Sequence, residues 1–383
     1  MPAEPDRMRR ERLLLVDRLT RAGTLRSEPL IRAFAEVPRE AFVPEASPAE
    51  VYIDSTVPVF DGRGDQITTS SQPGMMAFML EQLDLKPGHR VLEIGAGTGY
   101  NAAIIAEVAG PEGTVDTIEI DPTAANMATR ALASIGSRAR VHQADGALGW
   151  PGSEPYDRII ATVAVWDVPD AWIRQSASEA VLVAPLSILG EEYSCKWNVE
   201  NRSLRGCSAA PCAFVRFQGA MAHPNPHISL SDNGRGIGVL FGEEDRLPHR
   251  RTFDRWLAGP SRQERLWGVG DPDVFEGLVM WLLMTEGAEH LVRVWGHGPG
   301  APWQGPAVGL CDDNGIAFIA SSGRWIVYGE GPDKELWSRL DGWRLQGRPD
   351  LGSFRIDLIP GLQDAGPGRL PRREHTIIIT RRD

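Results

Sequence analysis

Apolar and polar residues alternate with two different periods in the first half of the chain. Five short apolar runs have the length and composition of buried strands. They are RVLEI (90–94), TVDTIEI (114–120), RVHQA (140–144), DRIIATV (157–163) and AVLVAPL (180–186). The segments between them, 100–109, 122–135 and 168–178, have helical periodicity instead. Because strands that alternate with helices form mostly parallel sheets covered on both faces, the pattern predicts a doubly wound α/β fold.

Residues 67–83, ITTSSQPGMMAFMLEQL, combine a block of hydroxyl residues with an apolar run. Pro73 suits the first turn of a helix, and apolar residues then recur at helical spacing. These apolar residues are Met76, Met79, Leu80 and Leu83. The hydroxyl block consists of Thr68, Thr69, Ser70 and Ser71. It therefore lies at or just before a helix N-terminus, where free N–H and O–H groups can meet an anion. A simple polar helix cap is the alternative that this stretch alone leaves open.

The N-terminal segment, MPAEPDRMRRERLLLVDRL, has no secretory apolar core, and its acidic residues argue against a transit peptide. Its pattern predicts an amphipathic helix. The residues expected to face inward are Leu13, Leu14, Val16 and Leu19.

The pattern changes after about residue 220, where MAHPNPHISLSDNGRG is polar and rich in turn-forming residues. We therefore predict two domains, residues 1–220 and 221–383, and a small α+β fold for the second. Its expected elements are a helix at 271–284, a hairpin at 315–329 and a strand at 373–382. Eight of the twelve tryptophans lie between Trp256 and Trp343. Core packing is the preferred interpretation of this enrichment, and a binding surface is the alternative.

Composition narrows the class of protein. A chain of 383 residues with 42% hydrophobic and 24% charged residues is typical of a soluble globular protein. The net charge of −11 argues against a nucleic-acid partner, and no apolar run is long enough to span a membrane. The four cysteines, Cys195, Cys207, Cys212 and Cys311, fit no usual zinc spacing. We expect reduced thiols, no bound metal and a cytoplasmic protein.

The stretch VLEIGAGTGY (91–100) carries the main chemical signal. An apolar strand ends in Gly95, Gly97 and Gly99 before a helix begins, and glycines there allow a tight turn that a ligand can approach closely. Glu119 ends the next strand, twenty residues after Gly99, where a carboxylate can bind ribose hydroxyls.

Two further acidic residues bear on which cofactor binds. Glu93 precedes the glycines, and Asp145 with Gly146 closes the third strand, where a carboxylate can receive an adenine amino group. Dinucleotide-binding folds share much of this geometry but favour a G-x-G-x-x-G spacing. The G-x-G-x-G spacing and the acidic residues favour S-adenosyl-L-methionine over NAD. A helix cap or a loop carboxylate is the alternative for Glu119 or Asp145 taken singly.

Taken together, residues 10–220 resemble the protein-L-isoaspartate O-methyltransferase family. The resemblance includes VPREAFVP (37–44), VYIDSTVPV (51–59), the hydroxyl block, the glycine turn and ADGALGWPGSEPYDRIIATVAVWDVPDAWIRQ (144–175). It implies a Rossmann-like class I fold and a substrate that is a peptide or protein presenting an Asp or isoAsp carboxylate. The catalytic candidates that it implies are Ser71, Ser70 and Thr69, with Ser71 as the active-site serine. The cofactor-binding candidates are Thr68, Thr69, Ser71, Glu93, Gly95, Ala96, Gly97, Gly99, Glu119, Ile120, Asp145 and Gly146.

The sequence departs from this family in two places. Ser70 stands where the family usually has an apolar residue, and Gly74 to Met76 lack the His or bulky residue often found there. About 160 residues also follow the usual end of the family's core. Such an extension resembles a branch found with lanthipeptide-type modified peptides, whose enzymes methylate an ordinary aspartate that then cyclises to an aspartimide. The expected activity is therefore dedicated aspartyl methylation of a precursor peptide.

Two other functions stay open at this point. One is a general isoaspartyl repair enzyme with an appended domain. The other is an inactive binding protein of the same fold, or a methyltransferase that acts on a small molecule. The intact glycine turn and hydroxyl block argue against inactivity. A carboxylate acceptor is already ionised at neutral pH, so the reaction needs positioning and exclusion of water rather than a strong base.

Overall fold

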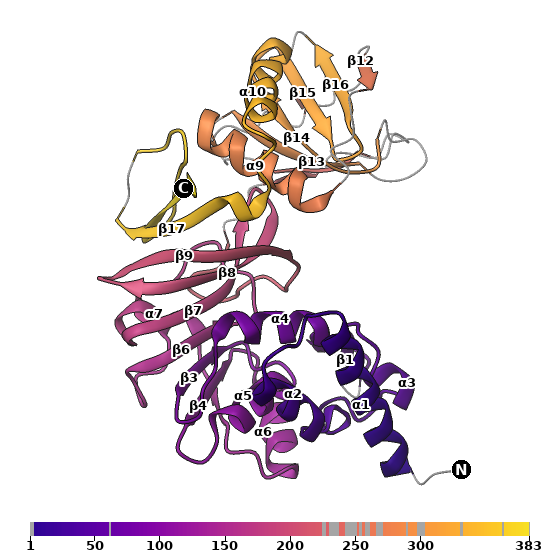
Figure 1. The fold of residues 1–383 in the computed structure, drawn as a ribbon, viewed down its shortest axis with the longest axis vertical. Helices are drawn as coiled ribbons and strands as arrows, with labels where there is room; N and C mark the ends of the chain where they lie inside the picture. The colour runs from indigo at the N-terminus through magenta and orange to yellow at the C-terminus, as the bar shows by residue number, and fades with distance from the viewer. Residues whose placement is uncertain are drawn as a thin grey trace. The chain divides into compact units, whose positions relative to one another are not determined.

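The computed structural model describes residues 4–60, 63–223, 227–229, 237–241, 251–252, 255–256, 261–265, 271–288, 290–296, 303–329, 332–361 and 364–382. These residues form two compact units, which are described separately (Figure 1). The first comprises Met1–Leu186, Ser194–Leu204 and Cys212–His223, and the second comprises Ser187–Tyr193, Arg205–Pro211 and Pro224–Asp383. The chain thus changes unit several times between residues 186 and 224. The limits 1–220 and 221–383 stay a prediction, and part of the turn-rich segment on which they depend lies outside the described residues.

The first unit is built on parallel strands, in the order β7-β6-β3-β4-β5. Their bounds are β3 (Arg90–Ile94), β4 (Thr114–Glu119), β5 (Arg140–Gln143), β6 (Tyr156–Ala161) and β7 (Ser176–Ile188). All five lie where the apolar runs predicted them, and β3 has the predicted bounds. β3 is buried at four of its five residues because it pairs on both sides. The predicted doubly wound α/β fold is confirmed.

Three helices connect or flank these strands: α4 (Pro73–Leu83), α5 (Tyr100–Ala109) and α6 (Pro122–Ser134). All three were predicted, and the Asp121 carboxylate caps α6 by accepting the N–H groups of Thr123 and Ala124. The helix predicted at 168–178 is only α7 (Asp170–Arg174), so that prediction was too long. The reason is local, because Pro169 precedes the helix and β7 already begins at Ser176.

The N-terminal segment forms α1 (Glu4–Arg21) and α2 (Glu28–Glu36), followed by the short helices η1 (Arg39–Phe42) and α3 (Pro48–Val51). The prediction that Leu13 and Leu14 face inward was wrong, because they are 45% and 41% exposed. The buried face carries Leu15, Val16 and Leu19 instead. A step of about 100° per residue rotates the first two leucines of the LLLV run out of this face.

The hydroxyl block lies mainly in a strand, not in a helix cap. β1 (Val57–Phe60) and β2 (Gln66–Ser70) pair as an antiparallel two-stranded sheet, with Val57 opposite Ser70 and Val59 opposite Thr68. Ser71 and Gln72 then lead into α4. The block therefore precedes the helix, as predicted, but β2 sets the direction of its first three side chains.

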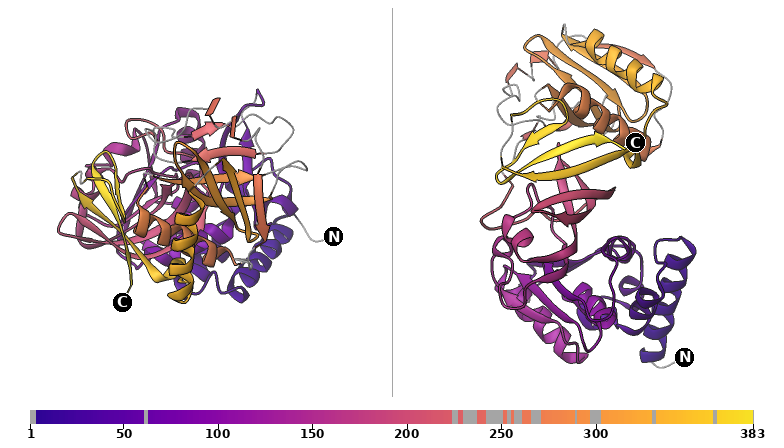
Figure 2. Two further views of the ribbon diagram at one scale, coloured as in Figure 1. Left: turned by 90° about the horizontal axis from the view of Figure 1, so that it is seen from above. Right: turned by 60° about the vertical axis from the view of Figure 1, so that its left-hand side comes forward.

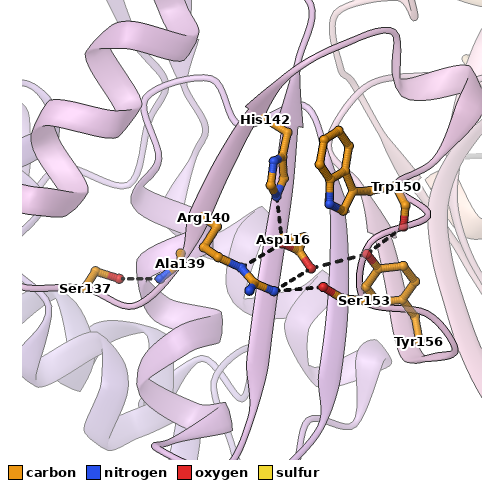
Figure 3. Close-up of polar contacts among 8 residues, drawn as sticks. All are labelled: Asp116, Ser137, Ala139, Arg140, His142, Trp150, Ser153 and Tyr156. Carbon is orange, nitrogen blue, oxygen red and sulfur yellow. Dashed lines mark hydrogen bonds and ion pairs between the residues drawn. The ribbon is translucent and has the colours of Figure 1, made fainter.

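A polar cluster fixes the pairing of β4 with β5 (Figure 3). The buried Asp116 carboxylate accepts hydrogen bonds from Arg140 Nε at 3.0 Å and Arg140 Nη2 at 3.1 Å, and it lies 2.7 Å from His142 Nε2. The His142 ring stacks on Trp150, with 3.7 Å between the ring centroids. Burial alone would raise the pKa of Asp116, but hydrogen bonds from His142, Ser153 and Arg140 hold it below its ordinary value.

The second unit is rich in strands. Its main sheet has the order β10-β11-β13-β14-β15-β16-β12, and its neighbouring strands pair antiparallel. The bounds are β10 (His227–Ser229), β11 (Ile237–Phe241), β12 (Ser261–Arg265), β13 (Leu291–Gly296), β14 (Gly305–Cys311), β15 (Gly315–Ala320) and β16 (Arg324–Gly329). A second group pairs in the order β17-β19-β18: β17 (Phe354–Pro360), β19 (His375–Arg381) and β18 (Arg369–Pro371).

Helices α9 (Pro272–Glu286) and α10 (Asp333–Leu345) lie against this unit's main sheet (Figures 1 and 2). The predicted helix, hairpin and final strand are therefore confirmed. Four of this region's tryptophans are buried, namely Trp256, Trp303, Trp325 and Trp343. Trp295 and Trp337 are 42% and 44% exposed, and Trp267 lies outside the described residues.

The remaining strands, β8 (Glu191–Glu200) and β9 (Ser203–Cys212), contain residues of both units. Cys195 and Cys311 are buried, and Cys207 and Cys212 are partly exposed. None of the described helices is long and apolar enough to span a bilayer.

Candidate active site

A cavity of about 460 Å³ lies in the first unit, where β3 and β4 end. Its walls come from the hydroxyl block, the glycine turn, the end of β4, the turn after β6 and residues 213–218. Ten of the predicted site residues line it: Thr68, Thr69, Ser70, Ser71, Gly95, Ala96, Gly97, Glu119, Ile120 and Gly146. Segments far apart in sequence therefore meet at the carboxyl ends of parallel strands, the usual ligand site in such sheets.

The glycine turn after β3 needs glycine at two positions. Gly95 has φ +94°, and a Cβ there would lie 2.7 Å from Thr162 Oγ1. Gly97 has φ +52°, and a Cβ there would lie 3.3 Å from Thr68 Oγ1, on the hydroxyl block. A side chain at either position would be strained; at Gly95 it would approach the turn after β6, and at Gly97 it would approach the hydroxyl block.

Glu119 is held rigidly at the end of β4. Its Oε2 accepts the Gly97 N–H at 2.9 Å, and its Oε1 accepts the Asp121 N–H at 3.1 Å. These two hydrogen bonds orient the carboxylate beside the glycine turn, and each oxygen retains a further lone pair. The arrangement suits a ligand with adjacent hydroxyl groups.

Three predicted site residues do not line the cavity. Glu93 is fully buried, accepting hydrogen bonds from Asn101 Nδ2 at 2.7 Å and Thr117 Oγ1 at 2.5 Å. Its burial raises its pKa to about 7. Gly99 begins α5 and packs against Ala128, and the Asp145 carboxylate accepts the N–H groups of Ala147 and Ala220. Ligand binding by these three stays a prediction.

The sequence reasoning missed Arg39, whose guanidinium is completely buried under the hydroxyl block. It donates to the carbonyl oxygens of Val51 at 2.7 Å, Ser55 at 3.2 Å and Ser71 at 2.9 Å. It also donates to the Ser70 hydroxyl at 3.4 Å. Burial lowers the pKa of Arg39 from its ordinary value, while the nearby Tyr100 acts in the opposite direction. The sequence signal was weak, a pair of charged residues inside VPREAFVP, because the main acceptors of Arg39 are backbone oxygens.

Asp54 was also missed as a site residue. Its Oδ1 accepts the Gly74 N–H at 2.7 Å, although twenty residues separate them in the chain. Asp54 therefore satisfies one of the free N–H groups at the start of α4. An incoming anion consequently has fewer backbone donors there than the sequence suggested.

The cavity's ionisable lining is sparse. Arg216, which the sequence analysis did not select, contributes a cation, and Glu119 and Asp121 contribute carboxylates. No His, Lys or Cys is among the described residues that line the cavity. The lining thus offers hydroxyl groups, backbone groups and one guanidinium, which can position an anionic acceptor.

The parallel sheet, the glycine turn and the carboxylate at the end of β4 define a class I methyltransferase. A match to the family described as protein-L-isoaspartate(D-aspartate) O-methyltransferase (PCMT) spans residues 9–220, more than half of the chain. The chain belongs to this family. It is an enzyme whose cofactor is S-adenosyl-L-methionine.

Two relatives illustrate the similarity. A protein-L-isoaspartate O-methyltransferase of Methanopyrus kandleri is 39% identical over 231 residues, covering 58% of this chain and 99% of the relative. The enzyme of the same name from Hyperthermus butylicus is 40% identical over 224 residues, covering 55% of this chain and 90% of the relative.

One of two similar solved structures extends the comparison beyond residue 220. One titled protein-L-isoaspartate O-methyltransferase covers 96% of this chain and 99% of its own, with a TM-score of 0.56 and 22% identity. Another, from Plasmodium falciparum in complex with S-adenosyl-L-homocysteine, covers 54% of this chain and 98% of its own, with a TM-score of 0.46 and 18% identity. The first similarity shows that the strand-rich second unit shares its fold with a structure of that title.

The cavity fits the cofactor by its shape and donor set. The glycine turn lines the cavity with backbone at Gly95 and Gly97, and the Glu119 carboxylate accepts the Gly97 N–H of the same turn. Gly95, Ala96 and Gly97 can approach the amino-acid end of the cofactor, while Glu119 and Ile120 can take the ribose and adenine. When bound, S-adenosyl-L-methionine supplies an electrophilic methyl group.

Proposed function

We propose that this enzyme methylates the free carboxylate of isoaspartyl residues in peptides and proteins, and that it accepts many different sequences. The observation that carries this proposal is the hydroxyl block in the wall of the same cavity as the glycine turn. Membership of the PCMT family supports the substrate class.

The chain's own residues then act by positioning. The Ser71 hydroxyl donates a hydrogen bond to one oxygen of the acceptor carboxylate and thereby aims the other oxygen at the cofactor. Arg216 adds positive charge to the cavity that receives this anion. The acceptor carboxyl has a pKa near 4, so it is ionised at neutral pH and needs no base. An acceptor bound between the hydroxyl block and the glycine turn loses water, which would otherwise solvate the nucleophile.

Arg39 supports this arrangement from below. Its hydrogen bonds to the Ser70 hydroxyl and the Ser71 carbonyl oxygen hold the chain in place at both residues. Fixing that backbone fixes the direction of the Ser71 side chain, so Arg39 is a positioning residue. Orientation of this kind lowers the barrier because the acceptor already has its reactive geometry when it binds.

A narrower hypothesis is that the substrate is one dedicated precursor peptide, methylated at an ordinary aspartate that then forms an aspartimide. The observation that favours it is the second unit, since the family match ends at residue 220. A structure titled protein-L-isoaspartate O-methyltransferase nevertheless covers 96% of the chain. An additional unit therefore does not by itself indicate a dedicated peptide, and we rank this hypothesis second.

The two hypotheses separate in one assay. Several unrelated peptide sequences are synthesised in matched pairs, with isoAsp or Asp at the same position, and incubated with methyl-labelled cofactor. The proposal predicts methyl ester on most isoAsp peptides, with kcat/KM at least tenfold above the Asp partners. A matched peptide with isoAsn, which lacks the free carboxylate, should give none. Preference for Asp, or restriction to a single sequence, would contradict the proposal and support the dedicated enzyme.

A further inference from the structure

A second hollow in the first unit, of about 510 Å³, lies beside the β1–β2 hairpin. We call it the hairpin groove; it is lined by residues 43–46, 50, 57–60, 67, 123 and 127. Most of these residues are apolar, and Phe60 is 47% exposed. Apolar side chains that gather in one exposed hollow mark an interaction surface more often than scattered ones do.

The hairpin groove adjoins the active-site cavity. Ile67 lines both hollows, and it directly precedes Thr68 of the hydroxyl block. The groove wall formed by β1 pairs with β2, and Val57 lies opposite Ser70. Antiparallel partners are separated by about 5 Å, and an extended peptide advances about 3.3 Å per residue. A substrate whose carboxylate is in the cavity therefore reaches the groove within two or three residues.

The polar residues of the groove restrict what it can bind. Glu45 and Glu50 are both exposed, and the described lining contains no Lys or Arg. Glu50 accepts the Ser47 N–H at 2.8 Å, and hydrogen bonds from Ser47 hold its pKa below the ordinary value. The two acidic side chains give the groove a negative character that suits a positively charged partner.

We propose that the hairpin groove binds an apolar side chain of the substrate, two or three residues from the acceptor, with a basic residue beside it. This proposal rests on the proposed function and deepens it. Its substrates are extended segments in which the modified aspartate is close to an apolar residue and a Lys or Arg. Folded proteins present such segments poorly, so the groove selects unfolded or locally opened chains.

The test compares isoAsp peptides that differ only near the acceptor. Leu or Ser is placed two and then three residues away on either side, with Lys or Glu next to it. The enzymes compared are the wild type, Phe60→Ser, Met127→Ser and the conservative Phe60→Leu. Leu345→Ser is the matched control, because Leu345 is 76% exposed and lines neither hollow.

For the wild type we expect kcat/KM about tenfold higher with Leu than with Ser at one of these positions, the factor that corresponds to burying part of one apolar side chain. Phe60→Ser and Met127→Ser should reduce this ratio to about two, while Phe60→Leu and Leu345→Ser should keep it. Lys beside the Leu should be preferred to Glu, and Glu45→Gln should weaken that preference. Cofactor affinity should stay unchanged in every variant.

Equal kcat/KM for the Leu and Ser peptides would overturn the groove proposal while leaving the proposed function intact. A fall in kcat/KM of Phe60→Ser that is the same for every peptide would also overturn the groove proposal. Failure of the wild type to methylate any isoAsp peptide would contradict the proposed function as well. Light scattering identifies the other possible occupant: a dimer that dissociates in Phe60→Ser but not in Leu345→Ser would assign the groove to a second copy of the chain.

Discussion

The Arg39 guanidinium donates a hydrogen bond to the Ser71 carbonyl oxygen at 2.9 Å, from a position with no exposure to solvent. A buried cation that binds mainly backbone oxygens carries a large desolvation penalty, and its hydrogen bonds must offset that penalty. The same guanidinium reaches Val51 and Ser55, so one side chain fixes the segment before β1 and the end of the hydroxyl block together. The geometry of the hydroxyl block thus depends on a residue outside the cavity lining.

Replacing Arg39 by Lys should reduce kcat more than it changes cofactor affinity. Lysine keeps the charge but offers three donors without the planar fork, so it cannot reach all of these oxygens. We expect kcat to fall about 10-fold to 100-fold, which corresponds to about 1.4 to 2.7 kcal/mol. The measurement is steady-state kinetics on an isoAsp peptide together with calorimetric titration of S-adenosyl-L-homocysteine. A loss of S-adenosyl-L-homocysteine affinity as large as the loss of kcat would show general unfolding instead. Arg10→Lys, on the exposed face of α1, is the control.

Replacing Ser71 by Ala should remove a hydrogen bond to the acceptor carboxylate. An unmade hydrogen bond of this kind costs about 1 to 3 kcal/mol, so kcat should fall roughly 5-fold to 100-fold. The dissociation constant of S-adenosyl-L-homocysteine should stay within about twofold. Ser134→Ala, at an exposed hydroxyl on α6, should leave both quantities unchanged. Full turnover in Ser71→Ala would exclude the assigned role.

Replacing Glu119 by Gln should affect the cofactor and spare the acceptor. The amide keeps the shape of the side chain, but only one oxygen remains to accept the N–H groups of Gly97 and Asp121. We expect cofactor affinity to fall about tenfold or more, because hydrogen bonds to a charged group contribute about 1.5 to 3 kcal/mol. At saturating cofactor, kcat should recover most of its value. Calorimetric titration measures cofactor affinity in both variants, and Glu112→Gln, at an exposed position, is the control. Unchanged cofactor affinity in Glu119→Gln would show that Glu119 is not part of the binding site.

The sequence was sufficient to predict the parallel sheet with its main helices, and the residue types that gather at the site, because those signals are local. Each strand and helix of the sheet has its own periodicity, and Gly95, Gly97 and Glu119 occupy positions fixed by the ends of β3 and β4. What could not be predicted depends on distant backbone groups. Asp54 caps Gly74 across twenty residues, and such a contact leaves no periodic trace.

Asp145 is a residue that the motif selected but whose carboxylate already has hydrogen-bond partners within the chain. A carboxylate at the end of the third strand suits an adenine amino group, yet in the structure Asp145 accepts the N–H groups of Ala147 and Ala220. The second of these partners is 75 residues away in the chain, beyond the reach of a local motif. A motif therefore indicates which residue types converge on a site, but it does not say which of their oxygens are already hydrogen-bonded.

The raised pKa of Glu93 predicts a pH dependence of stability. In the unfolded chain this carboxyl has an ordinary pKa of about 4.5, and burial raises the pKa to about 7 in the folded protein. Between these values the folded state keeps a proton that the unfolded state has lost. The contribution of Glu93 is therefore fully present below pH 4.5 and decreases as the pH rises to 7, by on the order of 3 kcal/mol.

Glu93→Gln should remove this dependence, since the amide does not ionise. Its NH₂ group can pair with Asn101 Oδ1, a buried atom that has no hydrogen-bond partner in the wild type. Urea denaturation of both proteins at pH 5 and pH 8 should show the variant gaining stability relative to the wild type at the higher pH. The contributions of other titrating groups cancel when the unfolding free energies of the two proteins are subtracted. Parallel dependence of stability on pH in the two proteins would therefore contradict the raised pKa of Glu93.

The last prediction concerns the second unit, where Arg293 and Glu276 form a buried ion pair. Arg293 Nη2 lies 2.7 Å from Glu276 Oε1, and Arg293 Nη1 also donates to the Tyr193 hydroxyl at 3.1 Å.

Arg293→Met would leave the Glu276 carboxylate buried without its cation. Breaking a buried pair from one side costs about 3 to 5 kcal/mol of unfolding free energy, whereas replacing both partners with apolar residues is often close to neutral. We therefore expect Arg293→Met to be strongly destabilising and Arg293→Met/Glu276→Leu to recover most of the loss. Chemical denaturation of the wild type, both single variants and the double variant measures the coupling, and additive losses would show that the pair contributes no coupling energy.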